Sequence, residues 1–335
     1  VKTLEEQGIR ENTIVMFTGD NGTTYPVKIT KPAPEGYPKV TGIRGARHRS
    51  QLRDGMKPIP DSALEGPLTR TVDGDVPGGK DLMSQRGVHV PLVVDWPAYR
   101  DNYQRIGHRN DGLVDFTDFV PTLCGLTGAQ LPTDRELDGQ SWVAALKGES
   151  ADTPRDAVFC HYWSFGRKQD QARTSIHDKR WKLYDNGNFF DLDSDGEEER
   201  PHPSDSLDQE TKESRNRLRS RMNEILVGKA EPASAAMSAK SSATRPNVVL
   251  IYSDDHGWRD VGYHGYRDVM TPNIDKLAAG GTQFSQGYVC ASVCGPSRAG
   301  LLTGVYQQRM GVYGNYDKGG IPTAQPMVFE MLKQQ

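Results

Sequence analysis

A cysteine, a proline, a serine and an arginine stand close together in the segment 294–303, which reads CGPSRAGLLT. We expect a helix over Arg298–Thr303, and Pro296 suits its first turn, where the missing N–H of proline costs nothing. A nucleophile at the start of a helix lies at the positive end of the backbone dipole, where free N–H groups favour anions. Arg298 adds a fork-shaped cationic donor that suits a tetrahedral oxyanion. The segment therefore favours a nucleophilic Cys294 that meets an anionic substrate.

Two adjacent carboxylates, Asp254 and Asp255, end the apolar run that begins after Arg245. The run predicts a buried strand of a parallel sheet, and ligands of open α/β sheets bind beyond the carboxyl ends of such strands. Adjacent acids repel each other unless a cation neutralises them, and hard oxygen ligands suit Ca²⁺ or Mg²⁺. The pair therefore indicates a metal site, although any acidic turn after a strand looks similar.

Two further polar groups lie in the N-terminal part of the chain. Asp20 and Asn21 follow a second apolar run, for which we expect a strand at Thr13–Thr18, and Lys80 follows two glycines. The alternative for Asn21 is an ordinary tight turn, since Asn-Gly is the commonest turn dipeptide. The alternative for Lys80 is a solvated surface lysine.

These segments resemble the type I sulfatases. The segment 294–304 is similar to the family signature C-x-P-S-R-x-x-x-L-T-G, and only Val305 departs, where an arginine is usual. The segments 245–257 and 11–22 are similar to the DDxG and DNG strands of the family, and 271–284 to its TPNIDxLAxxGxxF segment. The segment 78–97 resembles GGKxxxxEGGxRVPxIxxWP, with Gln85 and His89 in place of glutamate and arginine.

The resemblance implies a sulfuric ester hydrolase. A formylglycine-generating enzyme would oxidise Cys294 to formylglycine, whose hydrated aldehyde attacks the sulfur of a sulfated small molecule or glycan. The residues implied are Asp254, Asp255, Asp20 and Asn21 for Ca²⁺ (Mg²⁺ is the other candidate), Lys80 for the substrate sulfate, and Arg298 beside the nucleophile. Two alternatives stay open: a phosphodiesterase or phosphonate monoester hydrolase of the same superfamily, and an inactive fragment that only binds metal or sulfated glycan.

The fold implied is α/β, an alkaline-phosphatase-like mixed or parallel sheet flanked by helices, with a smaller antiparallel C-terminal-type subdomain in mid-chain. We expect 1–150 to form the second part of the catalytic domain, 151–228 the small subdomain, 229–244 a linker, and 245–335 the first part of the catalytic domain. The linker assignment follows from small polar composition. The further elements expected are a strand at Val88–Val94, short antiparallel strands within 156–195, and helices near Val1–Gln7, Thr117–Leu126, Ser141–Lys147 and Gln209–Val227.

The pieces stand in the reverse of the family order, and the family's GKWH segment and a later histidine have no counterpart here. Three interpretations explain this: a slice of a tandem sulfatase, a circular permutation that lost its middle, or two joined genes. We favour truncation. Because the leaving alcohol needs a general acid and the family's histidines are missing, we expect this chain alone to be weak or inactive.

Composition sets further bounds. The chain has 335 residues and a formal net charge of −3, which argues against a nucleic-acid partner. No apolar run approaches the ~20 residues of a membrane span. Four cysteines are too few for a disulfide scaffold, and a buried, inert Cys294 with Cys290 as its disulfide partner is the alternative to a nucleophile. The resemblance suggests a periplasmic or secreted protein, which the N-terminal residues do not decide.

The stretch between Asn21 and Lys80 is rich in proline and carries a basic cluster: Arg44, Arg47, His48, Arg49 and Arg53. A solvated loop is one interpretation of this stretch. The other is an insertion that faces the substrate and holds further anionic groups of a sulfated glycan.

Overall fold

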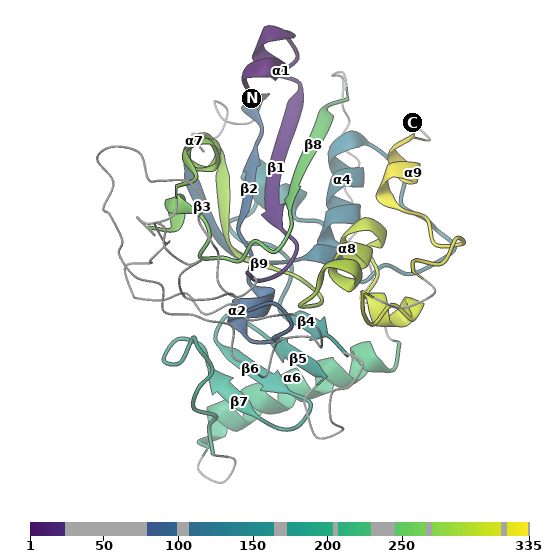
Figure 1. Ribbon diagram of the computed structural model, residues 1–335. Helices are drawn as coiled ribbons and strands as arrows, with labels where there is room; N and C mark the ends of the chain where they lie inside the picture. Colours follow the sequence, from purple (N-terminus) through teal and green to yellow (C-terminus); the bar gives the residue numbers. More distant parts are fainter. Residues whose placement is uncertain are drawn as a thin grey trace, which may run out of the picture.

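The computed structural model describes residues 1–23, 79–98, 107–163, 173–203, 207–228, 245–265, 270–315 and 320–333. In this part of the chain the strands form a five-stranded sheet and a four-stranded sheet, which make up the upper and lower halves of Figure 1. The basic cluster expected at 44–53 and the linker expected at 229–244 lie outside the described residues. The limits of the expected domains stay predictions.

The larger sheet is assembled from both ends of the sequence. Its strands are β1 (Thr13–Gly19), β2 (Leu92–Asp95), β3 (His108–Asp115), β8 (Asn247–Ser253) and β9 (Thr282–Tyr288), in the spatial order β3-β9-β2-β1-β8. Strand β1 pairs parallel with β8 and antiparallel with β2, while β9 pairs antiparallel with β2 and parallel with β3. The sheet is therefore mixed, and the predicted α/β class is confirmed.

Helices cover both faces of this sheet. On one face lie η3 (Phe116–Asp118), α4 (Phe119–Thr127), α5 (Val143–Lys147), α8 (Cys294–Thr303), η6 (Gln307–Met310) and α9 (Val328–Lys333), with the main hydrophobic core beneath them. On the other face, α7 (Pro272–Gly280) and the short η5 (Gly262–His264) enclose a smaller core, and α1 (Lys2–Glu6) lies at its edge. Figure 1 shows α7 on the left of the sheet and α4, α8 and α9 on its right.

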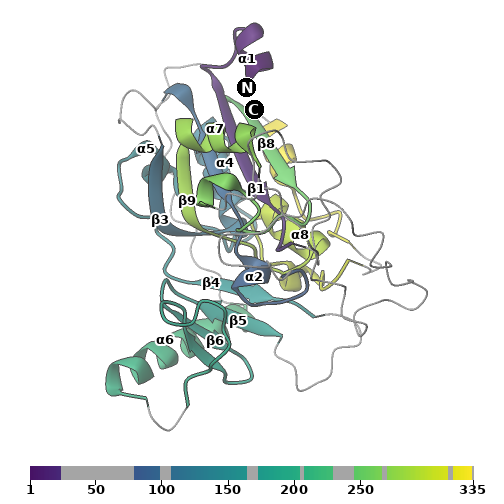
Figure 2. The same cartoon turned by 60° about the vertical axis from the view of Figure 1, so that its left-hand side comes forward.

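The smaller sheet is an antiparallel meander with one helix against it. Its strands are β4 (Val158–His161), β5 (Thr174–His177), β6 (Trp181–Tyr184) and β7 (Phe189–Asp191), and the helix is α6 (Gln209–Leu226). Helix α6 buries Leu218, Met222 and Ile225, residues three or four positions apart on one face. These side chains belong to the same core as the larger sheet, so the two halves share one hydrophobic interior. Figure 2 shows α6 beneath β5 and β6.

Element boundaries differ from the predictions where tertiary pairing decides them. The strand predicted at Val88–Val94 begins only at Leu92, because residues Gln85–Val88 form the one-turn helix α2 and Pro91 has no N–H to donate. The predicted helices are present at Lys2–Glu6, Phe116–Thr127 (a 3₁₀ turn continued by α4), Val143–Lys147 and Gln209–Leu226. Strands β3 and β9 were not predicted, since both are rich in polar residues and form by pairing with each other.

Strand β8 corrects a second expectation. The run was predicted to be a buried strand of a parallel sheet. It pairs parallel with β1, but among the described residues β8 is an edge strand of the sheet. Val249 is 37% exposed and Ile251 is 46% exposed, whereas every residue of β1 is buried. The physical reason is position: a strand with one neighbour leaves one side uncovered whatever its composition.

A buried arginine ties the two ends of the sequence together on the helical face. Arg155 donates from Nε to Asp118 at 2.7 Å, and its other nitrogens donate to the backbone oxygens of Ala157 and Asp138 and to the hydroxyl of Tyr306. The side chains of Arg155 and Asp118 are 2% and 1% exposed. The pair therefore lies where solvent cannot replace either partner.

None of the helices in the described residues is both long enough and apolar enough to cross a membrane.

Arg155→Met should destabilise the fold by about 3–5 kcal/mol, because it leaves the Asp118 carboxylate buried and unpaired. Equilibrium unfolding in urea measures the change in free energy. Arg109→Met is the matched control: its ion pair with Asp111 is 67% and 62% exposed, so its loss should cost at most about 1 kcal/mol. Equal losses in the two variants would contradict the assignment of Arg155 as a buried anchor.

Candidate active site

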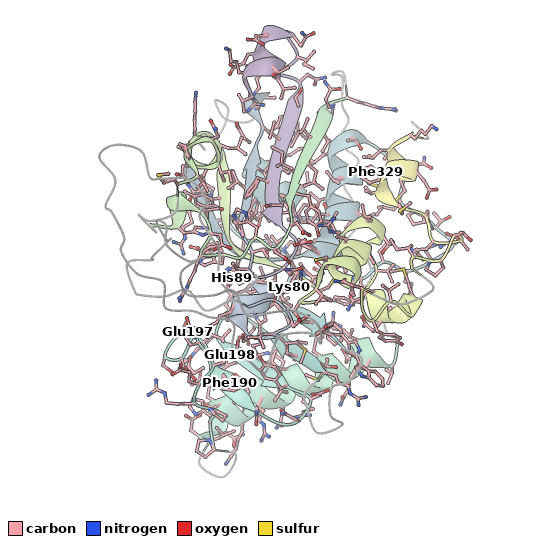
Figure 3. All side chains as sticks on the ribbon, viewed as in Figure 1. Lys80, His89, Phe190, Glu197, Glu198 and Phe329 are labelled. Atoms are coloured by element: carbon pink, nitrogen blue, oxygen red, sulfur yellow. The ribbon has the colours of Figure 1, made fainter. Side chains whose placement is uncertain are left out.

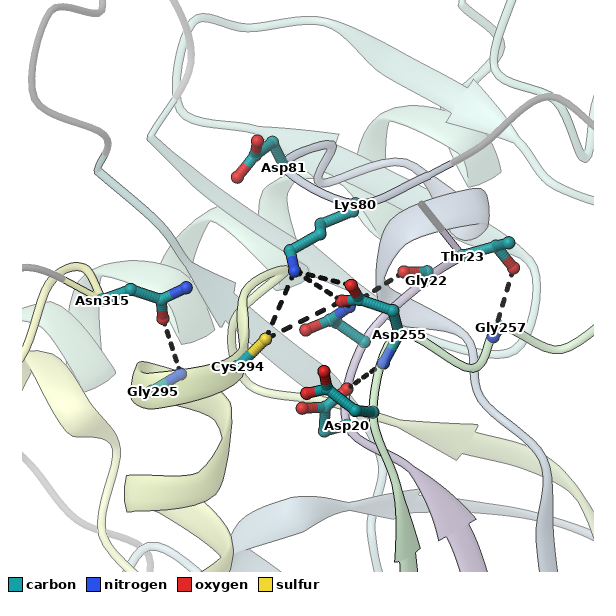
Figure 4. A network of polar contacts seen from close by, with 12 residues as sticks. Asp20, Gly22, Thr23, Lys80, Asp81, Asp255, Gly257, Cys294, Gly295 and Asn315 are labelled. Carbon is teal, nitrogen blue, oxygen red and sulfur yellow. Dashed lines mark hydrogen bonds and ion pairs between the residues drawn. The ribbon is translucent and has the colours of Figure 1, made fainter. Parts of the chain in front are cut away.

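The site begins where β1 and β8 end. The two strands run in register from Thr13 beside Asn247 to Gly19 beside Ser253, so the residues that follow them emerge together. The backbone N–H of Asp20 donates to the carbonyl oxygen of Ser253 at 3.0 Å. In return, the N–H of Asp255 donates to Asp20 Oδ1 at 2.9 Å (Figure 4). Parallel pairing thus places acids that are over 230 positions apart in the sequence side by side.

Close backbone approach requires glycine at this crossing. A Cβ added to Gly19 would lie 1.9 Å from the carbonyl oxygen of His256, and one added to Gly22 would lie 2.0 Å from that of Arg86. Asp255 itself has a φ of 51°, in the left-handed region that only a minority of non-glycine residues adopt. The carboxylates therefore stand on a tightly fitted turn.

Helix α8 brings the cysteine and the arginine. It begins at Cys294, four residues before the predicted start at Arg298, because Cys294-Gly-Pro already has helical backbone. The guanidinium of Arg298 donates to Asp20 Oδ2 from Nε at 3.0 Å and from Nη2 at 2.8 Å, and Nη2 also lies 2.6 Å from Asp254 Oδ1. Arg298 therefore bridges one carboxylate from each end of the sequence.

Lys80 completes the contacts on the opposite side. Its Nζ lies 2.6 Å from Asp255 Oδ1 and 2.8 Å from Oδ2, and 3.4 Å from the sulfur of Cys294 (Figure 4). The sulfur lies 3.7 Å from Asp255 Oδ1. A cation and a carboxylate thus flank the cysteine at the start of its helix.

Burial and charge shift the protonation of this group. Burial, with the carboxylate of Asp20 as the next cause, raises the pKa of Cys294 to about 12, so the side chain is a thiol at neutral pH. Burial is the largest influence on Lys80 and acts to lower its pKa, but the hydrogen bonds and charges of Asp255 and Cys294 together outweigh it, and the pKa is raised. Burial raises the pKa of Asp20 despite its bonds to Arg298.

The donor set suits a hard cation. Ligand atoms of Asp20, Asp254, Asp255 and Cys294 all lie within 4.8 Å of one another. The side-chain oxygen of Asn21 is buried beside them without a hydrogen-bond partner, while its nitrogen donates to Asp255 Oδ1 at 2.8 Å. A buried amide oxygen left without a donor fits a metal ligand. Three carboxylates and one amide oxygen form the kind of shell that Ca²⁺ or Mg²⁺ takes.

The structure brings all seven predicted site residues together, and their chemical roles stay predictions. The seven are Asp20, Asn21, Lys80, Asp254, Asp255, Cys294 and Arg298. The disulfide alternative is wrong: all four cysteines are free, and Cys290 is buried with its sulfur against Gly300 of α8.

Two residues near the site were not found from the sequence. Asn315 Oδ1 accepts from the N–H of Gly295 at 2.7 Å, and so caps α8 beside Cys294. Thr23 accepts from the N–H of Gly257 through its hydroxyl at 3.3 Å and joins the turn after β1 to the turn after β8. Each is an ordinary loop residue in the sequence, so only the fold reveals its contact.

Two family models match the chain. The model described as "Sulfatase" matches residues 1–129 and 246–335, and the model described as "N-sulphoglucosamine sulphohydrolase, C-terminal" matches residues 79–227. The first match covers both segments that supply the residues of the site, and the second covers the lysine segment and the small sheet.

Curated relatives include arylsulfatase A from Homo sapiens, 45% identical over 102 residues, which is 29% of this chain and 20% of that protein. Arylsulfatase A from Bos taurus is 42% identical over 105 residues, 30% of this chain and 21% of that protein. The matched part thus spans about a fifth of the length of these relatives. A solved complex of a protein with its substrate D-glucosamine-2-N,6-O-disulfate covers 72% of this chain and 38% of its own, at 17% identity and a TM-score of 0.41.

Gly19→Ala should destabilise the protein by about 1–3 kcal/mol, because the added methyl group collides with the backbone of the turn after β8. Urea denaturation followed by circular dichroism measures this. Gly196→Ala is the control, since its Cβ would meet only Leu192 at an ordinary 3.4 Å, with an expected change within about 0.5 kcal/mol. A Gly19→Ala variant as stable as the control would mean that the two turns are not in contact.

Proposed function

Because the chain belongs to the sulfatase family, we propose that its seven clustered side chains form the reaction centre for hydrolysis of a sulfate ester. The proposed substrate is a sulfated small molecule or glycan. The curated relatives that carry the name arylsulfatase support the first of these, and the match to an N-sulphoglucosamine sulphohydrolase model supports the second.

One observation carries the proposal. Four acidic or amide side chains, two cations and a helix-initiating cysteine come from four separate segments and contact one another directly. A structural ion-pair network has no need of a cysteine between a lysine and an aspartate. A site for a tetrahedral anion needs cations and helix N–H groups around one nucleophile, and this cluster has both.

Each group has a part in this proposal. Asp20, Asn21, Asp254 and Asp255 would hold Ca²⁺, which when bound would supply positive charge against the sulfate and lower the pKa of the nucleophile. Lys80 and Arg298 bind and orient the non-bridging oxygens and offset the charge that builds on them. A formylglycine made from Cys294 would supply a hydroxyl nucleophile at the place of the sulfur.

The leaving alcohol separates good substrates from poor ones. An alcohol of high pKa needs a general acid, and the family's histidines have no counterpart in this sequence, so we propose that alkyl sulfates react slowly. An aryl sulfate with a nitrophenol leaving group departs as a stable anion without a proton. Such a substrate therefore tests the sulfate site apart from the missing acid.

After co-expression with a formylglycine-generating enzyme, Cys294 should carry an aldehyde, and the chain should hydrolyse p-nitrophenyl sulfate. Mass spectrometry of the peptide containing residue 294 and release of nitrophenol are the two measurements. Cys294→Ala should reduce turnover by at least about 10³-fold, because it removes the nucleophile. Cys290→Ala, which removes a buried thiol outside the cluster, should leave it within about twofold.

Turnover that survives Cys294→Ala would refute the assigned nucleophile. Faster hydrolysis of bis(p-nitrophenyl) phosphate than of p-nitrophenyl sulfate would instead favour the phosphodiesterase alternative, which uses the same kind of cluster. An unmodified Cys294 with sulfate binding and no turnover would favour the fragment that only binds its ligands.

Ca²⁺ should stabilise the chain by about 2.7 kcal/mol when its concentration is about 100 times the dissociation constant. Thermal unfolding with and without Ca²⁺ measures this gain. Asp20→Asn should abolish it, because it removes the buried carboxylate shared by both turns, while Asp134→Asn, at an exposed aspartate paired with Arg135, should keep it. An equal gain in both variants would place the ion elsewhere.

A further inference from the structure

The segment that carries Lys80 runs between the two halves of the molecule. The N–H groups of Gly79 and Lys80 donate to the carbonyl oxygen of Thr23 at 2.9 and 3.2 Å, and that of Asp81 donates to Ser292 at 3.1 Å. The lysine is thereby attached to the turn after β1 and to the residues just before Cys294. The position of Lys80 then also depends on α2 (Gln85–Val88), which packs against this segment.

Helix α2 (Gln85–Val88) lies directly behind it without spare room. A Cβ on Gly79 would lie 1.8 Å from the carbonyl oxygen of Arg86, and that oxygen also faces Gly22. The N–H of Gly22 donates to the carbonyl oxygen of Gly87 at 2.9 Å. Because these are backbone-to-backbone contacts, a shift of α2 must displace both Lys80 and the turn after β1 that contains Gly22.

The start of α2 is fixed by a buried ion pair from the small sheet. Lys182 of β6 lies 2.9 Å from Glu198, and their side chains are 0% and 3% exposed. The ammonium of Lys182 donates to the carbonyl oxygen of Met83, and Glu198 accepts from the N–H of Gln85 at 2.7 Å. Both charged groups therefore form hydrogen bonds with the backbone of the segment 79–88. Figure 3 shows Glu198 below and to the left of Lys80, in the upper part of the lower half.

The backbone at Glu198 supports a specific role. Its φ is 60°, in the left-handed region, which costs a non-glycine residue about 1–3 kcal/mol and persists only where surrounding contacts enforce it. The hydroxyl of Tyr184 also donates to this carboxylate. Residue 84, which precedes α2, makes no side-chain cap, so Glu198 from the other half of the molecule supplies the acceptor that this helix lacks.

We propose that Lys182 and Glu198 are a positioning pair for Lys80: by holding the start of α2, they set where the ammonium group of Lys80 lies relative to Cys294 and Asp255. The inference rests on the proposed function, in which Lys80 binds the sulfate group. The small sheet then serves the reaction centre without touching it.

Stability alone does not account for the pair. A buried ion pair is often no more stabilising than two apolar side chains of similar size, while loss of one partner is costly. What apolar side chains cannot do is bond the backbone of Met83 and Gln85 and so fix α2. Stability and position can therefore be separated by experiment.

The probe is inorganic sulfate, titrated calorimetrically into the full chain with Ca²⁺ present, so that no turnover is required. Lys80→Ala should weaken sulfate binding, and Lys182→Met should raise the dissociation constant about tenfold. In the Lys80→Ala background, Lys182→Met should change it less than about twofold, because the group that it positions is absent. Lys179→Met is the control: this exposed lysine lies in the turn between β5 and β6, and its loss should leave the dissociation constant of sulfate unchanged.

The double variant Lys182→Met with Glu198→Met separates the two roles. It removes both charges, so it should be more stable than Lys182→Met alone, yet sulfate should still bind about tenfold more weakly than to the unaltered chain. If Lys182→Met does not fold, this variant decides the question. Sulfate affinity that recovers together with stability, or a loss from Lys182→Met that persists without Lys80, would overturn the inference. A Lys80→Ala variant that binds sulfate normally would refute the proposed role of Lys80 instead.

Discussion

Parallel pairing of β1 with β8 is the contact on which the rest of the site depends. The register sets Gly19 beside Ser253, so that Asp20 and Asp255 exchange backbone and side-chain contacts directly after the strands end. A one-residue slip would turn every side chain of the shifted strand to the opposite face and separate the two acidic turns. The glycine at position 19 permits the close approach that this register requires. The clustering of Asp20, Asn21, Asp254 and Asp255 therefore follows from strand pairing.

Charge compensation is the second constraint. Three carboxylates share a small volume, and like charges at this distance raise each other's pKa unless cations lie between them. Arg298 bridges Asp20 and Asp254, while Lys80 lies against Asp255. Lys80 faces the sulfur of Cys294, and Arg298 lies on the same helix as Cys294. The two cations that offset the charge of the carboxylates are therefore also placed to bind an anionic substrate. Lys80 and Arg298 thus stabilise the folded carboxylate cluster and, in the proposed function, bind the substrate.

The small sheet explains how a lysine from a separate segment reaches this cluster. Its buried Lys182–Glu198 pair bonds the backbone around α2, and α2 in turn lies against the turns of Lys80 and Gly22. The hydrophobic core runs without a break from α6 to the larger sheet, which keeps the two halves in one arrangement. In this proposal the small sheet sets the position of Lys80 through the backbone of α2, which is stiffer than a long side chain.

The sequence alone determined the α/β class and the antiparallel mid-chain strands from local patterns, and the identities of the seven clustered residues from the resemblance of their segments to the sulfatase motifs. Only the tertiary structure decided that β8 is an edge strand and that polar β3 and β9 are strands at all. It alone also decided that Asn315 accepts from the N–H of Gly295 and Glu198 from that of Gln85. The physical reason is the separation along the sequence between residues that interact. Hydrophobic periodicity and helix signals act within a few residues, whereas strand order and capping across the molecule depend on partners far away in the sequence, which no local pattern records.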